Sequence, residues 1–225
     1  MKGKNSKKRN SRERILEAAT NLFGRRGYHA TTVEDITRAA GITRGALYWH
    51  FDTKSDVLGA VVERLRKEYL NRFVKEISET GPIPMDKIWW TFKFNARFAV
   101  EHTDLVHCLR NLSLELSPSE DKNVKAFFRI LDKQRSFIVR LIEEAQKSGD
   151  IRKDLNAEML AAIILAIHDG ILLQWTAFKN RLDGKELVWS FRQVMLAGMS
   201  AGAEIVTPQK ASAPSRKDKK KRPSG

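Results

Sequence analysis

Thr43-Arg44-Gly45-Ala46-Leu47-Tyr48-Trp49-His50-Phe51-Asp52-Thr53-Lys54 is the stretch that combines a helix cap, aromatic residues and basic side chains in one short segment. The Thr43 side chain can accept hydrogen bonds from the amides of a first helical turn. A helix from Thr43 to His50 would be roughly 12 Å long at about 1.5 Å per residue, which is comparable to the width of the major groove of DNA. We therefore expect a short helix that can lie in that groove.

The residues before it predict a second short helix and a tight turn. Thr31 and Glu34 have the spacing of a capping box, and a shift by one residue to Thr32 and Asp35 fits equally well. Gly41 can take the left-handed backbone of a helix end. Between these signals, apolar residues recur at helical spacing: Val33, Ile36, Ala39 and Ala40. Two helices joined by a short turn with glycine predict a helix-turn-helix whose second helix reads DNA.

The chemistry of the expected reader helix fits this role. Leu47 and Phe51 are four residues apart and can face the core, which leaves the other side of the helix exposed. Arg44 could bind the O6 and N7 of guanine, and Gly45 would allow a close approach. The other candidate contacts, mostly to phosphates, are Thr43, Tyr48, Trp49, His50 and Lys54. The alternative for Tyr48, Trp49 and Phe51 is a role as core aromatics only.

Residues 12–62 resemble the DNA-binding domain of the TetR family of bacterial regulators. The resemblance rests on Ile15-Leu16-Glu17-Ala18-Ala19, Leu22-Phe23, Gly27-Tyr28, Thr31-Thr32-Val33, Ile36, Ala39-Ala40-Gly41-Ile42 and Gly45-Ala46-Leu47-Tyr48-Trp49-His50-Phe51 through Lys54. It implies an all-α protein with a three-helix DNA-binding domain fused to a helical ligand-binding and dimerisation domain. It also implies that Thr32, Arg44, Gly45, Tyr48, Trp49, His50 and Lys54 contact DNA.

The charge distribution points to a polyanionic partner and to two unfolded ends. The net charge is +14, and residues 1–14 and 208–225 each carry seven basic residues and one acidic residue. Few apolar residues accompany these charges, which is typical of disorder. We therefore expect a disordered basic arm at 1–10, a DNA-binding domain at 11–52, a sensing and dimerisation domain at 53–204, and a disordered basic tail at 205–225. The arm could enter the minor groove, whereas the tail could simply be solvated.

Other features argue for a cytoplasmic protein without catalytic or metal chemistry. The single cysteine, Cys108, excludes an intrachain disulfide. No apolar stretch follows the basic start, and His168, Asp169 and Gly170 interrupt the longest apolar run before it could span a membrane. His102, His107 and Cys108 do not share a helical face, so we expect no metal site. No catalytic arrangement or cofactor motif is recognisable, and we predict neither an enzyme nor a cofactor.

Helical periodicity continues through the rest of the chain and predicts about nine helices in total. The expected helices of the second domain are Thr53 to the Gly81-Pro82-Ile83-Pro84 breaker, 85–102, 105–116, 122–148, 158–178 and 185 to about 201. Residues 158–178 are apolar almost all round, which favours contacts on several faces. With 185–201 they could form a four-helix bundle with a second copy; the alternative is the core helix of a monomer.

Aromatic residues of the second domain could line a cavity for an apolar or aromatic effector, or could be plain core. The candidates are Trp89, Phe92, Phe98, Phe127, Phe137, His168 and Trp175. Together with the resemblance, they favour a homodimeric repressor that binds a palindromic double-stranded DNA operator and is released by a small apolar or aromatic molecule. A transcriptional activator, and a nonspecific nucleic-acid-binding protein driven by basic tails, remain the alternatives.

Overall fold

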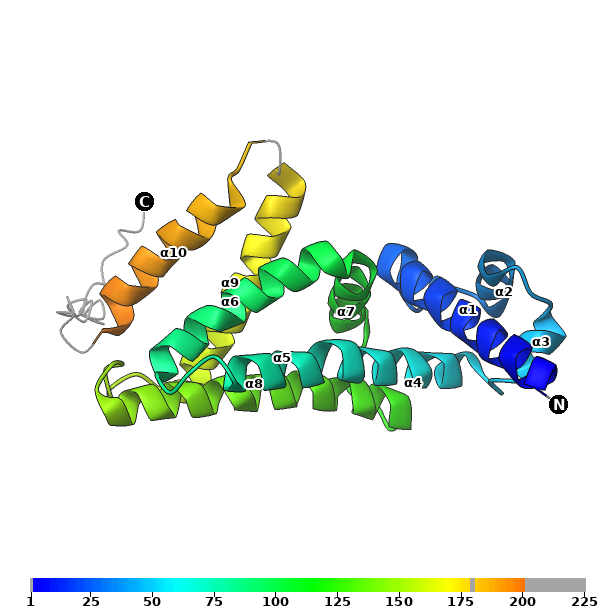
Figure 1. Ribbon diagram of the computed structural model, residues 1–225, viewed down its shortest axis with the longest axis horizontal. Coiled ribbons are helices and arrows are strands. Elements are labelled where there is room, and N and C mark those ends of the chain that lie inside the picture. Colours follow the sequence, from blue (N-terminus) through cyan, green and yellow to red (C-terminus); the bar gives the residue numbers. More distant parts are fainter. Residues whose placement is uncertain (1, 179–180, 201–225) are drawn as a thin grey trace, which may run out of the picture.

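The computed structural model describes residues 2–178 and 181–200, with side chains from residue 11 on, and within these ranges the chain is all α-helical without a named strand. Figure 1 shows a three-helix head at one end and a longer helical body. The elements are α1 (Lys2–Arg26), α2 (Val33–Ala40), α3 (Arg44–Tyr48), α4 (Lys54–Leu65), the π-helical turn η1 (Arg66–Leu70), α5 (Asn71–Ser78), α6 (Pro84–Glu101), α7 (Thr103–Glu115), α8 (Lys122–Ser148), α9 (Ala157–Phe178) and α10 (Gly184–Met199). Because α4, η1 and α5 are continuous, the described chain forms nine separate helices, in agreement with the predicted number.

The head forms around apolar side chains that the three helices direct to a common core. Ile15 and Phe23 of α1, Ile36 of α2 and Leu47 of α3 have no exposed surface. The first helix is longer than expected: α1 begins at Lys2, so the residues predicted as a disordered arm continue it. Lysine and arginine have good intrinsic helix propensity, which explains how a polar segment can extend a packed helix. The predicted tail at 205–225 lies outside the described residues.

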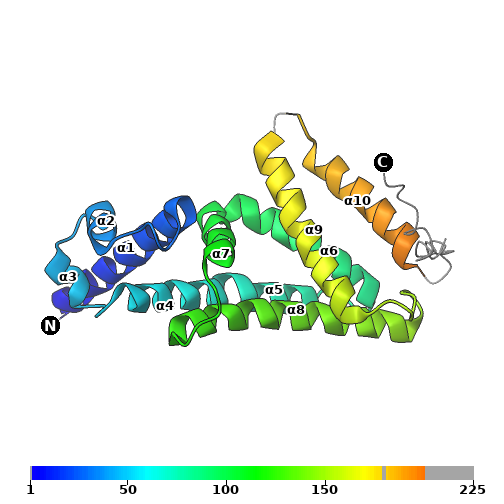
Figure 2. The same ribbon diagram turned by 180° about the vertical axis from the view of Figure 1, so that it is seen from behind.

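The helix predicted from Thr53 to the Gly-Pro breaker is present but contains the π-helical turn η1, which the sequence did not indicate. Its inward residues Leu65, Tyr69, Phe73 and Ile77 are spaced four apart and are all buried. Four residues exceed one α-helical turn of 3.6, so this spacing would drift around the helix, and a wider turn takes up the excess. Figures 1 and 2 show the rod formed by α4, η1 and α5 lying along α8.

The head contacts the body through α1 and α7. At Gly24 of α1 a Cβ atom would lie only 3.0 Å from the backbone nitrogen of Cys108, so glycine permits this close approach. The Asn111 side chain donates a hydrogen bond of 2.8 Å to the Gly24 carbonyl. Burial in this contact raises the pKa of the Cys108 thiol to about 12, so the thiol stays protonated at neutral pH.

Helix α9 has two different faces. Leu160, Ala161, Ile164 and His168 are buried on one face, whereas Met159, Ile163 and Leu173 on the other are at least half exposed. By length and composition alone α9 could cross a membrane. Its buried face, however, bonds to α6 through His168, whose ring nitrogens lie 3.3 Å from the Thr91 hydroxyl and 3.2 Å from the Asn95 amide nitrogen.

Candidate nucleic-acid interface and effector site

Local side-chain caps define both helices of the helix-turn-helix. The first begins with a capping box between Thr32 and Asp35, the second of the two registers that the sequence allowed. It ends at Gly41, whose φ of 59° and ψ of 45° are left-handed. The Thr43 hydroxyl then accepts a hydrogen bond of 3.2 Å from the Ala46 amide and starts α3. The turn is therefore set by residues that contact neighbours three positions away.

Helix α3 presents its predicted reader face to solvent. Leu47 and Phe51 are 0% and 6% exposed, whereas Tyr48 and Trp49 are 40% and 68% exposed. Thr43, Arg44 and Gly45 are also exposed. A Cβ at Gly45 would meet no atom within 4 Å, so the backbone there is open to an approaching molecule.

Arg44 is ordered by two partners on the surface of the head. Its Nη1 lies 2.7 Å from the Glu34 carboxylate, and its Nη2 donates a hydrogen bond of 3.2 Å to the Tyr48 hydroxyl. The side chain is still 63% exposed. Such a guanidinium can exchange its surface partners for the edge of a guanine without any rearrangement of the core.

The other predicted DNA-contacting residues have structural partners that sequence reasoning missed. The Lys54 ammonium donates hydrogen bonds of 3.0 Å to both the Tyr28 and the Thr31 carbonyls and lies 4.3 Å from the centre of the Tyr28 ring. This burial lowers the pKa of Lys54. His50 lies with its Nε2 2.8 Å from the Ser11 hydroxyl. Both residues therefore hold the head together, beside any contact they make with phosphate.

The predicted effector residues do not converge on one cavity. Phe98 and Phe137 belong to an inner aromatic cluster in which neighbouring ring centres are 5.1 to 6.1 Å apart: Tyr69, Phe73, Phe94, Phe98 and Phe137. Phe127 is fully buried and contacts Phe128. Trp175 packs against Gly184 at the α9–α10 connection. Their separation follows from the helix packing, which directs similar side chains into different layers.

Trp89, Phe92 and His168 do come together, in an outer aromatic cluster that also contains Phe191 of α10. The Phe92 and His168 rings are 3.8 Å apart, and Phe191 lies 4.8 Å from Phe92 and 6.3 Å from Trp89. The indole Nε1 of Trp89 is buried and has no hydrogen-bond partner among the described residues. Phe191 was not among the predicted effector residues, because a single phenylalanine on an amphipathic helix has no sequence signal that points to a ligand site.

A chain of hydrogen bonds between side chains connects the two clusters and defines the tautomer of His168. Gln134 donates to the Tyr69 hydroxyl at 2.6 Å, and Tyr69 donates to the Asn95 carbonyl oxygen at 3.1 Å. The Asn95 amide nitrogen then donates to His168 Nδ1. Since the Thr91 hydroxyl donates to the Ile88 carbonyl at 2.6 Å, it must accept from His168 Nε2. His168 is therefore neutral, with its proton on Nε2.

This buried histidine predicts a pH-dependent stability. Burial lowers the pKa of His168 from 6.5 to about 3. Between these pH values the imidazole is protonated in the unfolded chain and neutral in the folded chain. The free energy of unfolding is therefore highest above pH 6.5 and decreases as the pH falls. The loss that His168 causes is about 2 kcal/mol at pH 5. We expect His168→Gln, which can keep both hydrogen bonds but does not titrate, to lose less stability between pH 7 and pH 5 in urea unfolding. The exposed His29→Gln is the control, and equal losses in wild type and His168→Gln would contradict the assignment.

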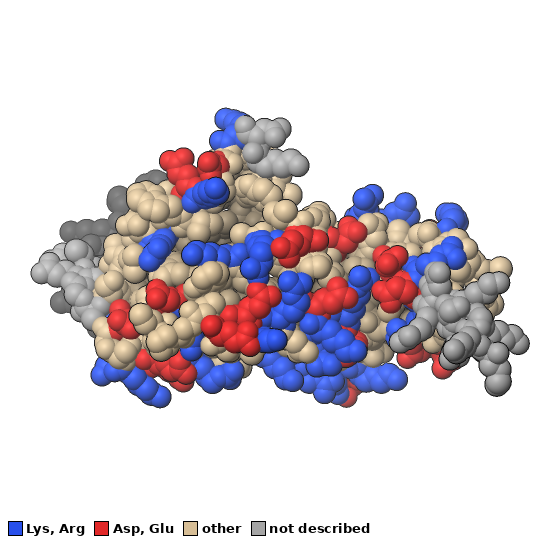
Figure 3. Space-filling view, viewed as in Figure 1, with Lys and Arg blue, Asp and Glu red and all other residues tan. Residues whose placement is uncertain are grey.

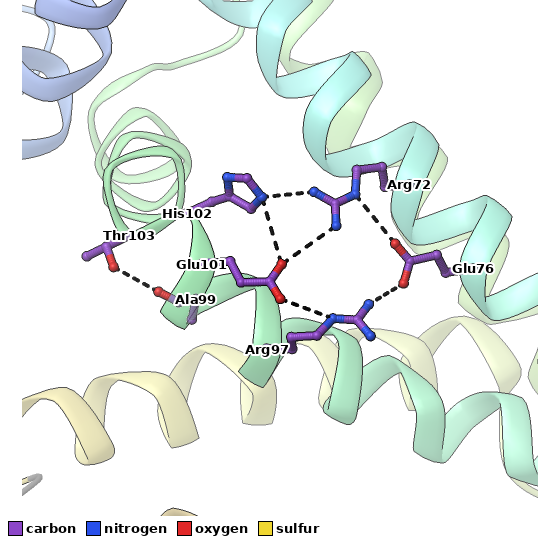
Figure 4. Close-up of polar contacts among 7 residues, drawn as sticks. All are labelled: Arg72, Glu76, Arg97, Ala99, Glu101, His102 and Thr103. Carbon is purple, nitrogen blue, oxygen red and sulfur yellow. Dashed lines mark hydrogen bonds and ion pairs between the residues drawn. The ribbon is translucent and has the colours of Figure 1, made fainter.

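The junction of head and body holds a polar hollow and a network of charges. The hollow has a volume of about 640 Å³ and is lined by Glu17, Thr20, Asn21, Arg64, Glu101, His102, Thr103, Asp104 and Leu105. Figure 4 shows the adjoining network between α5 and the end of α6, in which Arg97 contacts both Glu76 and Glu101. Arg72 Nη1 lies 2.8 Å from His102 Nε2. These contacts join α5 to the α6–α7 corner, and none of them was foreseen from the sequence.

On one face of the molecule (Figure 3), the charge of the body is mixed. On the face drawn in Figure 3, lysine and arginine side chains alternate with aspartate and glutamate over the body. The head has a capped α3 that faces outward and carries an exposed arginine, and it is joined to a helical body. This arrangement defines a helix-turn-helix DNA-binding regulator.

The comparisons with known proteins agree with this class. Residues 15–61 match the family model described as bacterial regulatory proteins, tetR family. The HTH-type transcriptional repressor DhaR of a Mycobacterium species is 31% identical over 76% of this chain and 84% of its own length. The HTH-type transcriptional regulator TtgR of Pseudomonas putida is 27% identical over 77% of this chain and 83% of its own length.

The solved structures include the MbdR regulator from Azoarcus sp. CIB, which is 31% identical, covers 87% of this chain and 100% of its own, and superposes with a TM-score of 0.71. The chain belongs to the TetR family of bacterial transcriptional regulators. It is a DNA-binding regulator and not an enzyme.

Proposed function

We propose that the protein is a homodimeric repressor that binds a palindromic operator and is released by a small apolar or aromatic effector. The observation that carries this proposal is the exposed, ordered Arg44 on a capped α3 whose opposite face is buried. DhaR, a similar protein by sequence, is named a repressor, which favours repression over activation. We place the protein in the cytoplasm, where its DNA target is accessible.

The proposed dimer uses the exposed face of α9 together with α10. Along α9, the residues Met159, Ile163, Ala166, Gly170, Leu173 and Ala177 recur every three or four positions and so share one side of the helix. They lie opposite the buried face that contains His168. Trp189 of α10 is 61% exposed. Exposed large apolar side chains around small residues suit a helix pair from a second copy, and two reader helices one DNA turn apart would recognise a palindrome.

The proposed effector acts through α6. This helix carries Trp89 and Phe92 of the outer aromatic cluster, and its other end meets α7, which packs on α1 of the head. The start of α4 is tied to α8, because Ser55 donates to the Asp121 carboxylate at 2.6 Å. A displacement of α6 would therefore turn the head about the segment 53–60. Operator and effector would then weaken each other by the same factor.

Selection of bound duplexes from a random DNA pool tests the DNA half of the proposal. We expect an inverted repeat that binds at least about a thousandfold tighter than random duplex. Equal affinity for random DNA would instead favour a nonspecific nucleic-acid-binding protein. The selected operator, titrated with a panel of apolar and aromatic compounds, tests the sensing half, which fails if no compound lowers operator affinity.

A further inference from the structure

Trp89 is a buried hydrogen-bond donor with no acceptor in the described part of the chain. The side chain is 7% exposed, and its Nε1 makes no hydrogen bond there. Buried indole N–H groups usually have a partner, because a donor removed from water without a new acceptor loses its hydration and gains nothing in return. The Trp89 donor therefore lacks the acceptor that a buried indole N–H normally has, and none of the described residues supplies one.

A guanidinium group lies on the same indole. The Cζ atom of Arg192, on α10, is 5.3 Å from the centre of the Trp89 ring. Arg192 is exposed and forms no ion pair with any carboxylate of the described residues. Two donors therefore lie at one aromatic ring: the neutral indole N–H of Trp89 at its edge and the Arg192 guanidinium over its face. Neither has an anionic partner among the described residues.

The surroundings of these donors are apolar. Phe92 and Phe191 pack beside Trp89 with ring centres 5.8 and 6.3 Å from it. His168 contributes no free polar atom, since both ring nitrogens are bonded to Thr91 and Asn95 of α6. A molecule bound here would meet aromatic rings and two donors, and so it needs an apolar body and an anionic acceptor.

We propose that the site between α6 and α10 formed by Trp89, Phe92, Phe191 and Arg192 binds the carboxylate of an apolar acid. The carboxylate accepts from the Trp89 Nε1–H and from the Arg192 guanidinium, and the apolar part of the acid packs on Phe92 and Phe191. This assignment rests on the proposed effector-sensing function and specifies the chemical class of the effector. A guanidinium and a second N–H donor match the two oxygens of a carboxylate.

Calorimetric titration of the full chain with two matched pairs of probes tests this site. The probes are 4-phenylbutyrate with 4-phenylbutyramide, and octanoate with octanamide, which differ in charge but hardly in shape. We expect each acid to bind at least about tenfold tighter than its amide, which corresponds to one charge-assisted hydrogen bond. Arg192→Gln should remove this preference, and Trp89→Phe should weaken acid and amide alike by about tenfold.

The neighbouring residues provide matched controls. Lys93 Nζ lies 4.5 Å from the centre of the Trp90 ring, so Trp90→Phe and Lys93→Gln alter the same kind of pair one position away and should leave binding unchanged. Thermal melting shows whether Trp89→Phe still folds. Arg192→Gln replaces a side chain that is exposed in the single chain, so it tests the site even if the first variant unfolds.

The outcomes separate this inference from the proposed function. The carboxylate site is wrong if neither acid binds with a Kd below about 1 mM, if amides bind as well as acids, or if Arg192→Gln keeps the preference. The effector proposal still stands if neutral apolar compounds release the operator. Conversely, acids that bind through Trp89 and Arg192 without changing operator affinity would support the site and contradict the regulatory role.

Discussion

Leu173→Glu is expected to dissociate the proposed dimer into monomers. Leu173 is 53% exposed in the single chain and belongs to the apolar face of α9 that we assign to the second copy. In a symmetric interface the substitution would bury one unpaired carboxylate from each subunit, at a cost of at least about 4 kcal/mol. Sedimentation equilibrium should therefore show a dimer dissociation constant raised by about a thousandfold or more.

The exposed residues of other helices supply the control for this substitution. Val100 of α6 and Leu114 of α7 are 66% and 78% exposed, outside α9 and α10. Val100→Glu and Leu114→Glu should leave the oligomeric state unchanged. Val100→Glu and Leu114→Glu should also melt near the wild-type temperature, whereas Leu173→Glu should melt lower, because it loses the stabilisation that dimerisation adds to the folded chain. A Leu173→Glu protein that remains dimeric at micromolar concentration would refute the α9 interface.

The second large effect is expected at the reader helix. Arg44→Ala should lower the affinity for the selected operator by about thirtyfold or more, since a bidentate arginine–guanine contact contributes about 1–3 kcal/mol of discrimination and a dimer has two such contacts. Tyr48→Ala should also weaken binding, because the Tyr48 hydroxyl accepts a hydrogen bond from Arg44 and helps to orient it. Fluorescence anisotropy with operator and random duplexes measures both quantities.

Arg44→Ala is expected to reduce the specificity for the operator, whereas a control substitution removes only a positive charge. Lys147→Ala removes one positive charge from the last turn of α8, at the end of the body away from the head (Figure 1). This control should change operator affinity little. Arg44→Ala should reduce operator binding far more than random-duplex binding. Equal losses on both duplexes would show that Arg44 contacts phosphate and that the bases are read by another residue.

Features that depend on near neighbours in the chain were predictable. The caps at Thr32 and Thr43 and the glycine turn at Gly41 involve contacts within a few residues. The sequence indicated Thr43 and Gly41 and left Thr31 and Thr32 as alternatives for the first cap. The exposed face of α3 followed from the four-residue spacing of Leu47 and Phe51. The boundaries of the long helices of the body, such as Lys122–Ser148, followed from strong start and stop signals, whereas the start of α1 did not.

The effector site was less predictable, because its residues come from different helices. Trp89 and Phe92 were candidates. Nothing in the sequence placed Phe191 and Arg192 beside this pair. Nor did the sequence show that Phe98 and Phe137 belong to a different cluster. Periodicity tells which side of a helix is apolar and leaves open which neighbour covers it. The unpartnered Trp89 donor became visible only when the acceptors around it were known.

From the sequence alone came the helical class, the helix-turn-helix and the direction in which Arg44 and Tyr48 point, since caps, turns and helical faces depend on side chains a few residues apart. Only the tertiary structure showed that Lys54 bonds to carbonyls 23 and 26 residues away, that Gly24 lets α7 approach α1, and that Trp89 and Arg192 form a pair. Such contacts depend on how whole helices pack, and packing joins residues whose separation along the chain carries no periodic signal.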